Sequence, residues 1–420
     1  MKKNQNLLLV VFIFVAACGT SYSMAESSKS RVMNPNIPAA DVKTLVDGNN
    51  AFALDIYRSL HSESGNLILS PYSMSLALAM PYAGAHGETE SQMANVLHFT
   101  QSQAVLHPAF NALDLALAEV PTDLRKNQDP LTLSIANAVW AEQTYPFQQD
   151  YLDTIALNYG AGVFLADFKN QFGSARKDIN QWVGDETKNK IKNPLSEGAV
   201  NADTRMVLVN AIYFKADWDS PFNASSTEKA PFYLLDDSQV TVQMMRDHFS
   251  VPYYAGNGYQ AVELPYAGQT TAMDIILPDA GNYDAFESSF GLETYTEMIN
   301  GFQYAGVNMG LPQFTFTKDF NLTNILTTMG MPDAFDINAA DFSGMTGAKD
   351  MYIGNVIHKA FVAVDEKGTE AAATTISIVI GGAAPIDVNF TADHPFIFII
   401  RDTVNGQILF IGRVLNPLEE

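Results

Sequence analysis

The segment from Asp365 to Phe390, DEKGTEAAATTISIVIGGAAPIDVNF, constrains the fold of this chain more than any other. Its run from Thr374 to Ile380 is rich in β-branched residues, which disfavour a helix because branched side chains prefer strands. A pre-formed strand is also disfavoured, since the small residues bury little surface and the run ends in two glycines followed, after two alanines, by a proline. The segment therefore predicts a long exposed loop that could become a strand.

The first seventeen residues are predicted to be a secretion signal. Two lysines precede an apolar run, Leu7 to Ala17, whose eleven residues are too few to cross a bilayer. The run ends in VAAC, which resembles the lipobox of bacterial lipoproteins, where the signal is removed before an acylated cysteine. That resemblance implies that residues 1–17 are a lipoprotein signal peptide and that Cys18 is the lipidation site. The alternative is a plain secretory peptide with an incidental cysteine.

The location expected from the lipobox is the bacterial cell envelope. Gly19 follows the cysteine, and in that family a residue other than aspartate there favours the outer membrane, with the protein facing the periplasm or the exterior. Residues 18–40 are polar, contain two prolines, and predict a flexible tether between the lipidated cysteine and the folded part. Residues 41–420 are predicted to form one folded domain. Cys18 is the only cysteine, so disulfides are not expected.

The charge and motif content exclude several classes of function. A formal net charge of −22 argues against nucleic acid, heparin-like polyanions or anionic lipid as partners, so no heparin-type activator is expected. The sequence lacks the H-E-x-x-H, G-x-S-x-G, P-loop and strand-linked G-x-G-x-x-G motifs. We therefore expect no catalytic residues, metal or cofactor, and interpret His358, within an apolar strand pattern, as a core histidine.

Several motifs, in order along the chain, resemble those of the serpin family from Asp41 to Pro417. They are NLILSPYSMSLALAM, INQWV, NAIYFKADWDSPF, GMPDAFD, IHKAFVAVDEKGTEAAAT and ADHPFIFIIRDTVNGQILFIGRVLNP. The resemblance implies an α+β fold with three β-sheets, eight or nine helices and an exposed reactive-centre loop. It also implies that four residues lie where the central sheet opens: Ser70, Ser73, Trp218 and His358.

The serpin resemblance further implies a mechanism. A target serine protease cleaves the loop and is trapped as the acyl-enzyme, while the loop inserts as a new strand of the main sheet. The chain is thus expected to be a monomeric suicide-substrate inhibitor that forms a covalent complex with its target. The alternative is a non-inhibitory serpin that acts as a binding or carrier module.

The loop hinge of inhibitory serpins has close counterparts here. They are Glu366, Gly368, Thr369, Glu370, Ala371, Ala372, Ala373, Thr374 and Thr375. Side chains alternate between the two faces of a strand, so the inward set would be Thr369, Ala371, Ala373, Thr375, Ser377 and Val379. None of these is charged, and Glu370 falls on the opposite face. A charge in the inward set would be buried unpaired at a high cost, so the pattern favours an inhibitor.

The spacing of the family places the reactive bond fourteen residues after the hinge glycine, at Gly382–Ala383. No lysine or arginine lies between Gly368 and Phe390, which disfavours a target of trypsin type. Small-residue proteases of elastase or subtilisin type fit best, and cleavage at neighbouring residues stays open. The residues that flank the bond and would set specificity are Val379, Ile380, Gly381 and Ala384.

Overall fold

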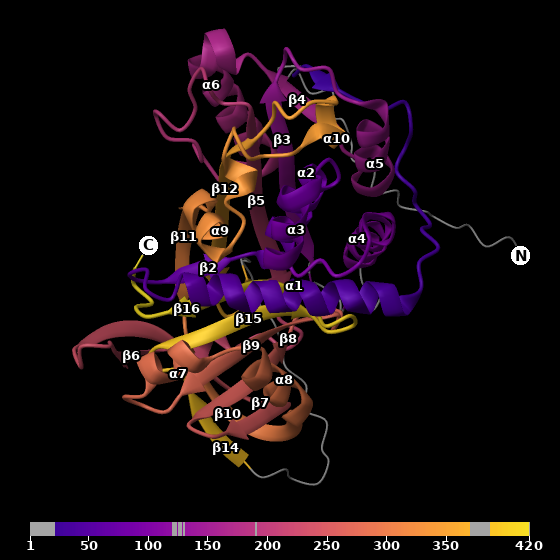
Figure 1. Cartoon of the computed structure of the whole chain (residues 1–420). Coiled ribbons are helices and arrows are strands. Elements are labelled where there is room, and N and C mark those ends of the chain that lie inside the picture. The colour runs from indigo at the N-terminus through magenta and orange to yellow at the C-terminus, as the bar shows by residue number, and fades with distance from the viewer. Residues whose placement is uncertain are drawn as a thin grey trace, which may run out of the picture.

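The computed structural model describes residues 22–119, 124, 128, 131–189, 191–369 and 387–419. These residues form two β-sheets that are covered by α-helices, ten in all (Figure 1). Their buried apolar side chains make one large hydrophobic core and one smaller one. The expected α+β fold class is confirmed. Ten helices replace the eight or nine expected, although one of them, α10, spans only four residues.

The first sheet has seven strands in the order β1-β4-β3-β5-β13-β12-β11. Their bounds are β1 (Met24–Ala25), β4 (Val163–Ala166), β3 (Thr132–Glu142), β5 (Met206–Asp217), β13 (Gly368–Thr369), β12 (Ile353–Val364) and β11 (Phe314–Asn321). The sequence of β5, MVLVNAIYFKAD, is nearly continuously apolar because both faces of the strand are buried. Strand β5 is the middle strand of this sheet.

The second sheet has nine strands, eight of them in the order β14-β10-β7-β8-β9-β15-β16-β2, with β6 pairing to β7. Their bounds are β14 (Asp387–Thr391), β10 (Gln303–Pro312), β7 (Gln239–Gly256), β8 (Tyr259–Pro265), β9 (Thr271–Pro278), β15 (Phe396–Asp402), β16 (Ile408–Val414), β2 (Leu67–Leu69) and β6 (Glu228–Tyr233). The serpin resemblance implied three sheets. Two of them are continuous here because the long strand β7 pairs successively with β6, β10 and β8.

The helices cover both sheets. Their bounds are α1 (Ala39–Ser59), α2 (Pro71–Tyr82), α3 (Gly87–Val96), α4 (Gln103–Leu117), α5 (Gln149–Tyr159), α6 (Phe168–Glu186), α7 (Tyr283–Ser289), α8 (Leu292–Gly301), α9 (Thr323–Met329) and α10 (Ser343–Thr346). Helix α2 is buried along its whole length, as its apolar sequence predicts. No helix in the described part of the chain is long and apolar enough to span a membrane.

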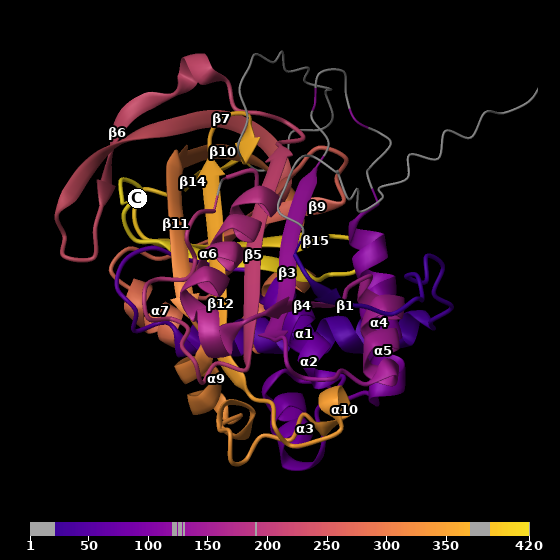
Figure 2. The same ribbon diagram turned by 90° about the horizontal axis from the view of Figure 1, so that it is seen from above.

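Helix α6 covers the face of the seven-stranded sheet that lies away from the main core (Figure 2). Ile179, Trp182 and Val183 of α6 are buried in a second apolar cluster. That cluster also holds Trp140 of β3 and Val209 of β5. The helix is therefore fixed to the middle strands of the sheet by apolar burial, which is the main stabilising term in folding.

The predicted flexible tether is wrong for residues 22–38, which are docked on the domain. The ring of Tyr22 meets those of Trp140 and Phe164 edge-on, with centroids 5.3 and 6.2 Å apart. Strand β1 then pairs with β4 and extends the sheet. The polar composition of the segment indicated a tether. The docking could not be seen in the sequence because the residues that bind the segment lie far along the chain.

Two ion pairs hold the rest of the docked segment. Lys29 lies 2.6 Å from Asp153 of α5. Arg31 donates to Asp114 at 2.6 Å and to Asn111 at 2.7 Å, both on α4. The side chain of Arg31 is only 11% exposed, so these partners must compensate its guanidinium for the loss of hydrating water.

We predict that Arg31→Ala lowers the free energy of unfolding by about 1.5–3 kcal/mol, because it removes charge-assisted hydrogen bonds that hold the segment on α4. Lys43→Ala is the control, since Lys43 and Asp47 form an exposed pair on α1 that contributes less than about 1 kcal/mol. Guanidinium unfolding followed by fluorescence measures both. Equal midpoints for the two variants would show that residues 22–38 do not stabilise the domain.

Candidate functional site

The candidate site is the seam between β5 and β12 in the seven-stranded sheet. At one end of the seam the two-residue strand β13 lies between them: Gly368 pairs with Asp217, and Thr369 pairs with both Ala216 and Val364. Along the rest of the seam β5 pairs directly with β12 through eight residue pairs. Continuing the chain beyond Thr369 as a strand would therefore require β5 and β12 to separate.

Gly368 is required by the closeness of β5. A Cβ at this position would lie 2.1 Å from the carbonyl oxygen of Ala216, far inside van der Waals contact. The glycine thus lets the hinge enter the seam while its backbone pairs with β5. Gly368 is the residue that the sequence predicts as the hinge glycine.

Thr369 directs its side chain into the main core. It is 1% exposed, and its hydroxyl lies 2.8 Å from the hydroxyl of Tyr266, a buried residue. Burial raises the pKa of Tyr266, which keeps the phenol neutral as a hydrogen-bond partner. In the inserted strand that the sequence predicts, Thr369 belongs to the inward set.

Trp218 fixes the turn that joins β12 to β13. Its ring stacks on Tyr266 with centroids 4.6 Å apart. Its indole N–H donates to the carbonyl of Asp365 at 3.0 Å, and its backbone N–H donates to the carbonyl of Lys367 at 2.7 Å. The Asp365 carboxylate accepts from the backbone N–H groups of Lys367 and Gly368 within the same turn.

Glu366 connects the hinge to the strands beside it. Its carboxylate accepts hydrogen bonds from Thr227 at 2.6 Å and from Gln313 at 2.8 Å. Its backbone carbonyl accepts from the N–H of Phe222 at 2.8 Å. The hinge position of Glu366 was predicted, whereas its partners were missed because they are distant in sequence.

A buried polar network closes the middle of the seam. His358 of β12 is fully buried, and its Nε2 accepts from the backbone N–H of Ser70 at 3.2 Å. Its Nδ1 then carries the proton and donates to the side-chain oxygen of Asn210, its direct partner across the seam on β5. Burial lowers the pKa of His358 to about 3, so the ring is neutral near pH 7.

Asn210 and Ser73 connect this pair to the neighbouring elements. The Asn210 amide donates to the hydroxyl of Ser73 on α2 and to the side chain of Asn137 on β3. Asn137 donates in turn to the carbonyl of Ser73 at 3.1 Å. The hydroxyl of Ser70 donates to the carbonyl of Leu409 at 2.7 Å. A new strand in this seam would separate Asn210 from His358.

The four residues predicted at the sheet opening therefore occupy two places. Ser70, Ser73 and His358 share the buried network, while Trp218 lies at the hinge end of the same seam. Sequence reasoning missed Asn210 and Asn137. The signal for Asn210 was a lone amide within the apolar run MVLVNAIYF, because a buried amide requires hydrogen-bond partners.

The other predicted site residues lie outside the described residues. They are Cys18, the hinge residues 370–375, the reactive bond Gly382–Ala383 and the flanking residues 379–381 and 384. Among the described residues, no group of three or more His, Cys, Asp or Glu side chains could hold a metal ion.

Comparison with known proteins identifies the family. The family model described as serpin (serine protease inhibitor) matches residues 47–417. The chain belongs to the serpin family. It is 37% identical over 391 residues to leukocyte elastase inhibitor of Homo sapiens, in an alignment that covers 90% of this chain and all of the relative. It is 33% identical to an uncharacterized serpin-like protein of Thermococcus kodakarensis, with 99% of each chain covered.

Solved serpin structures have the same fold. Native tengpin, a thermophilic serpin, superposes with a TM-score of 0.82 at 26% identity and covers 94% of this serpin and all of its own chain. Uncleaved ovalbumin superposes with a TM-score of 0.79 at 29% identity and covers 89% of this serpin and all of its own chain. The family members named as inhibitors are inhibitors of proteases rather than catalysts.

We predict that the stability of this serpin falls as the pH is lowered from 6.5 toward 3, in part through His358. The unfolded histidine takes up a proton below its ordinary pKa of 6.5, while the buried ring stays neutral down to about pH 3. The stabilisation is thus complete above pH 6.5, and up to about 1.4 kcal/mol is lost per pH unit within this window.

Denaturant unfolding at several pH values tests this prediction. His358→Gln should reduce the pH dependence, whatever its effect on stability at pH 7. His61→Gln is the control, because His61 is exposed and lies outside the network. An unchanged slope in His358→Gln would show that His358 does not contribute to the pH dependence.

Proposed function

We propose that this serpin is a suicide-substrate inhibitor of serine proteases, which traps the acyl-enzyme by inserting its cleaved loop between β5 and β12. The observation that carries the proposal is the position of β13. Gly368 and Thr369 already pair with strands at one end of the seam, so a strand that continued from Thr369 would enter it. The uncharged inward set from Thr369 to Val379 supports the same conclusion.

Insertion would be favourable because one hydrogen-bonded ladder becomes two. The direct β5–β12 pairing would be replaced by pairing of the new strand with both neighbours. About a dozen added backbone hydrogen bonds, at about 1 kcal/mol each, are comparable with the whole stability of a typical domain. The form with an uninserted loop would therefore be metastable.

We propose an elastase- or subtilisin-like protease as the target. Relatives from Homo sapiens, Equus caballus and Sus scrofa that are 37% identical to this serpin are named leukocyte elastase inhibitors. The proposed bond Gly382–Ala383 offers small side chains, and the loop has no basic residue. Both features suit a protease with a small specificity pocket.

We also propose that Cys18 is lipidated and anchors the protein to the outer membrane of a bacterium. Only three residues lie between Cys18 and the docked Tyr22, and the four steps of chain reach at most about 14 Å. Strand β3 begins at Thr132, which lies beside the hinge end of β5. It ends at Glu142, at the opposite end of the sheet, where β4 and β1 pair. The membrane would then lie near the end of the sheet opposite the hinge, and the loop would face away from it.

The insertion proposal predicts opposite outcomes for two neighbouring substitutions. Ala373→Arg should convert the inhibitor into a substrate, because Ala373 is in the inward set and would carry a charge into the core. Ala372→Arg is the matched control, because its side chain would face outward and should leave inhibition largely intact. Each protein is incubated with pancreatic elastase and examined for an SDS-stable complex.

Complex formation by Ala373→Arg at the wild-type level would contradict insertion. Clean cleavage of the wild type without a complex would favour the binding or carrier alternative. Sequencing the N-terminus of the fragment released by elastase locates the reactive bond, which we expect after Gly382.

For the anchor, we predict that Cys18→Ser moves the protein from the membrane fraction to the soluble fraction of bacterial cells. Thr20→Ser is the control and should leave the protein in the membrane fraction, because it preserves the cysteine. Fractionation with detection by antibody measures both. Retention of the Cys18→Ser protein on membranes would refute lipidation at this residue.

A further inference from the structure

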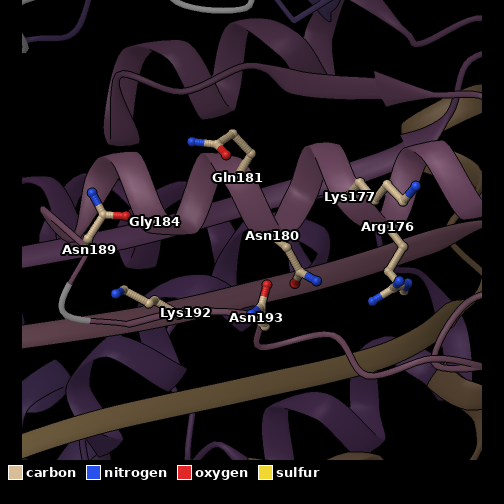
Figure 3. A pocket seen from close by; sticks show the side chains of 8 residues that line it. All are labelled: Arg176, Lys177, Asn180, Gln181, Gly184, Asn189, Lys192 and Asn193. Carbon is tan, nitrogen blue, oxygen red and sulfur yellow. The ribbon is translucent and has the colours of Figure 1, made fainter.

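A polar cavity of about 350 Å³ lies between α6 and the segment that follows it (Figure 3). Three cationic side chains line it: Arg176 and Lys177 from α6, and Lys192 from the segment. Figure 3 shows Asn180 and Asn193 close together between them, with Arg176 and Lys192 on either side. Among the described residues, no carboxylate and no aromatic ring lines the cavity.

This concentration of positive charge is unusual in a chain with 46 acidic and 24 basic residues. Lys177 and Lys192 are exposed residues, and neither ammonium group forms an ion pair or donates a hydrogen bond within the part of the chain that the structure describes. Two acids contact lining residues: Glu197, 94% exposed, lies 4.0 Å from Arg176, and Asp185 accepts from Gln181. Lys177 and Lys192 therefore bring positive charge to the cavity that no ion pair among the described residues neutralises.

The walls of the cavity are held in place by hydrogen bonds. Asn180 is buried and bonds both the N–H and the carbonyl of Leu195 at 2.9 Å. Arg176 donates to the same carbonyl at 3.0 Å and is only 20% exposed. Asn189 and Asn193 have left-handed backbones, with φ of 61° and 49°, a conformation that is uncommon outside glycine. Leu195 is thus bonded firmly to α6, and Asn189 and Asn193 have an uncommon backbone conformation beside the helix.

We propose that this cavity binds a compact, phosphorylated sugar. Arg and Lys recognise phosphate oxygens by charge-assisted hydrogen bonds, and the side-chain amides can pair with sugar hydroxyls. The absence of an aromatic ring from the lining argues against a nucleotide base. The strongly acidic remainder of the protein would repel an extended polyanion, so the ligand must be small.

Occupation of the cavity would affect loop insertion, an inference that rests on the proposed function. The segment 191–200 crosses the seam, because the carbonyl of Lys192 accepts from Lys359 at 3.3 Å and that of Ala199 accepts from Asn355 at 2.6 Å, both on β12. Leu195 is also buried in the apolar cluster with Val209 of β5. A new strand between β5 and β12 must disturb these contacts.

A ligand that joins α6 to Lys192 would hold the segment on the sheet and slow insertion. Slower insertion would allow more of the trapped acyl-enzyme to be hydrolysed. The ligand would thus turn part of the inhibitor into substrate, and the number of inhibitor molecules consumed per protease inactivated would rise.

Binding is tested first, by calorimetry with fructose 1,6-bisphosphate as the probe and fructose as the unphosphorylated control. We expect the bisphosphate to bind and fructose not to bind. The double variant Lys177→Gln/Lys192→Gln should bind the bisphosphate with an affinity at least about tenfold lower, since it loses two charge-assisted contacts. Lys169→Gln/Lys229→Gln is the control, because it makes the same change in net charge away from the cavity.

Two sources of the phosphorylated sugar are separated with vesicles. Phosphatidylcholine vesicles that contain lipid A, a phosphorylated disaccharide, should compete with the bisphosphate if the ligand is a lipid headgroup. No competition identifies a free sugar phosphate as the source. No binding of the bisphosphate, or equal binding by the two double variants, would overturn the site.

The effect on insertion is tested by titrating elastase with the inhibitor in the presence and absence of the bisphosphate. We expect more inhibitor to be consumed per protease with the wild type, and no change with Lys177→Gln/Lys192→Gln. Binding without this effect would overturn the link to insertion. Failure of the proposed function is distinguishable, because then no stable complex forms even without the bisphosphate, while the binding result still decides the site.

Discussion

The hydrogen bonding across the seam between β5 and β12 is the constraint on which the rest of the structure depends. Eight residue pairs and the bond between Asn210 and His358 hold the seam closed, while β13 holds it open at one end. The seven-stranded sheet therefore has a position for a further long strand, of which only the first two residues, those of β13, are in place. The hinge contacts of Trp218, Tyr266 and Glu366 fix where that position starts.

Elements on both faces of the seven-stranded sheet contact the strands that form the seam. Helix α2 brings Ser70 and Ser73 to the buried network from the main core. Helix α6 and the segment 191–200 cover the opposite face, and the segment is hydrogen-bonded to β12. The docked residues 22–38 extend the sheet at its far edge through β1. Opening the seam thus involves contacts on both faces of the sheet.

The parts of the site that local chemistry determines could be predicted from the sequence. Alternation along a strand predicts that Thr369 faces inward in an inserted loop, and in this structure its hydroxyl is bonded to the buried Tyr266. Gly368 was predicted as the hinge glycine by the family motif, and the closeness of Ala216 gives the physical reason. The α+β fold was likewise predicted from the order of several motifs.

The parts that depend on distant residues could not be predicted. Residues 22–38 were predicted to be a tether because their partners are distant. Trp140, Asp114 and Asp153 are each more than eighty residues away from the residue that they contact in the segment. The continuity of two expected sheets depends on the pairing length of β7. The basic cavity beside α6 was hidden by the net charge of −22, which averages over the whole chain.

The central claim is that the chain after Thr369 enters the seam once the loop is cut. The most direct measurement is hydrogen exchange, together with thermal unfolding, on the intact protein and on protein cleaved in its loop. The account predicts that the cleaved form unfolds at a much higher temperature and that residues following Thr369 become protected. Equal unfolding temperatures, with no new protection after Thr369, would contradict it.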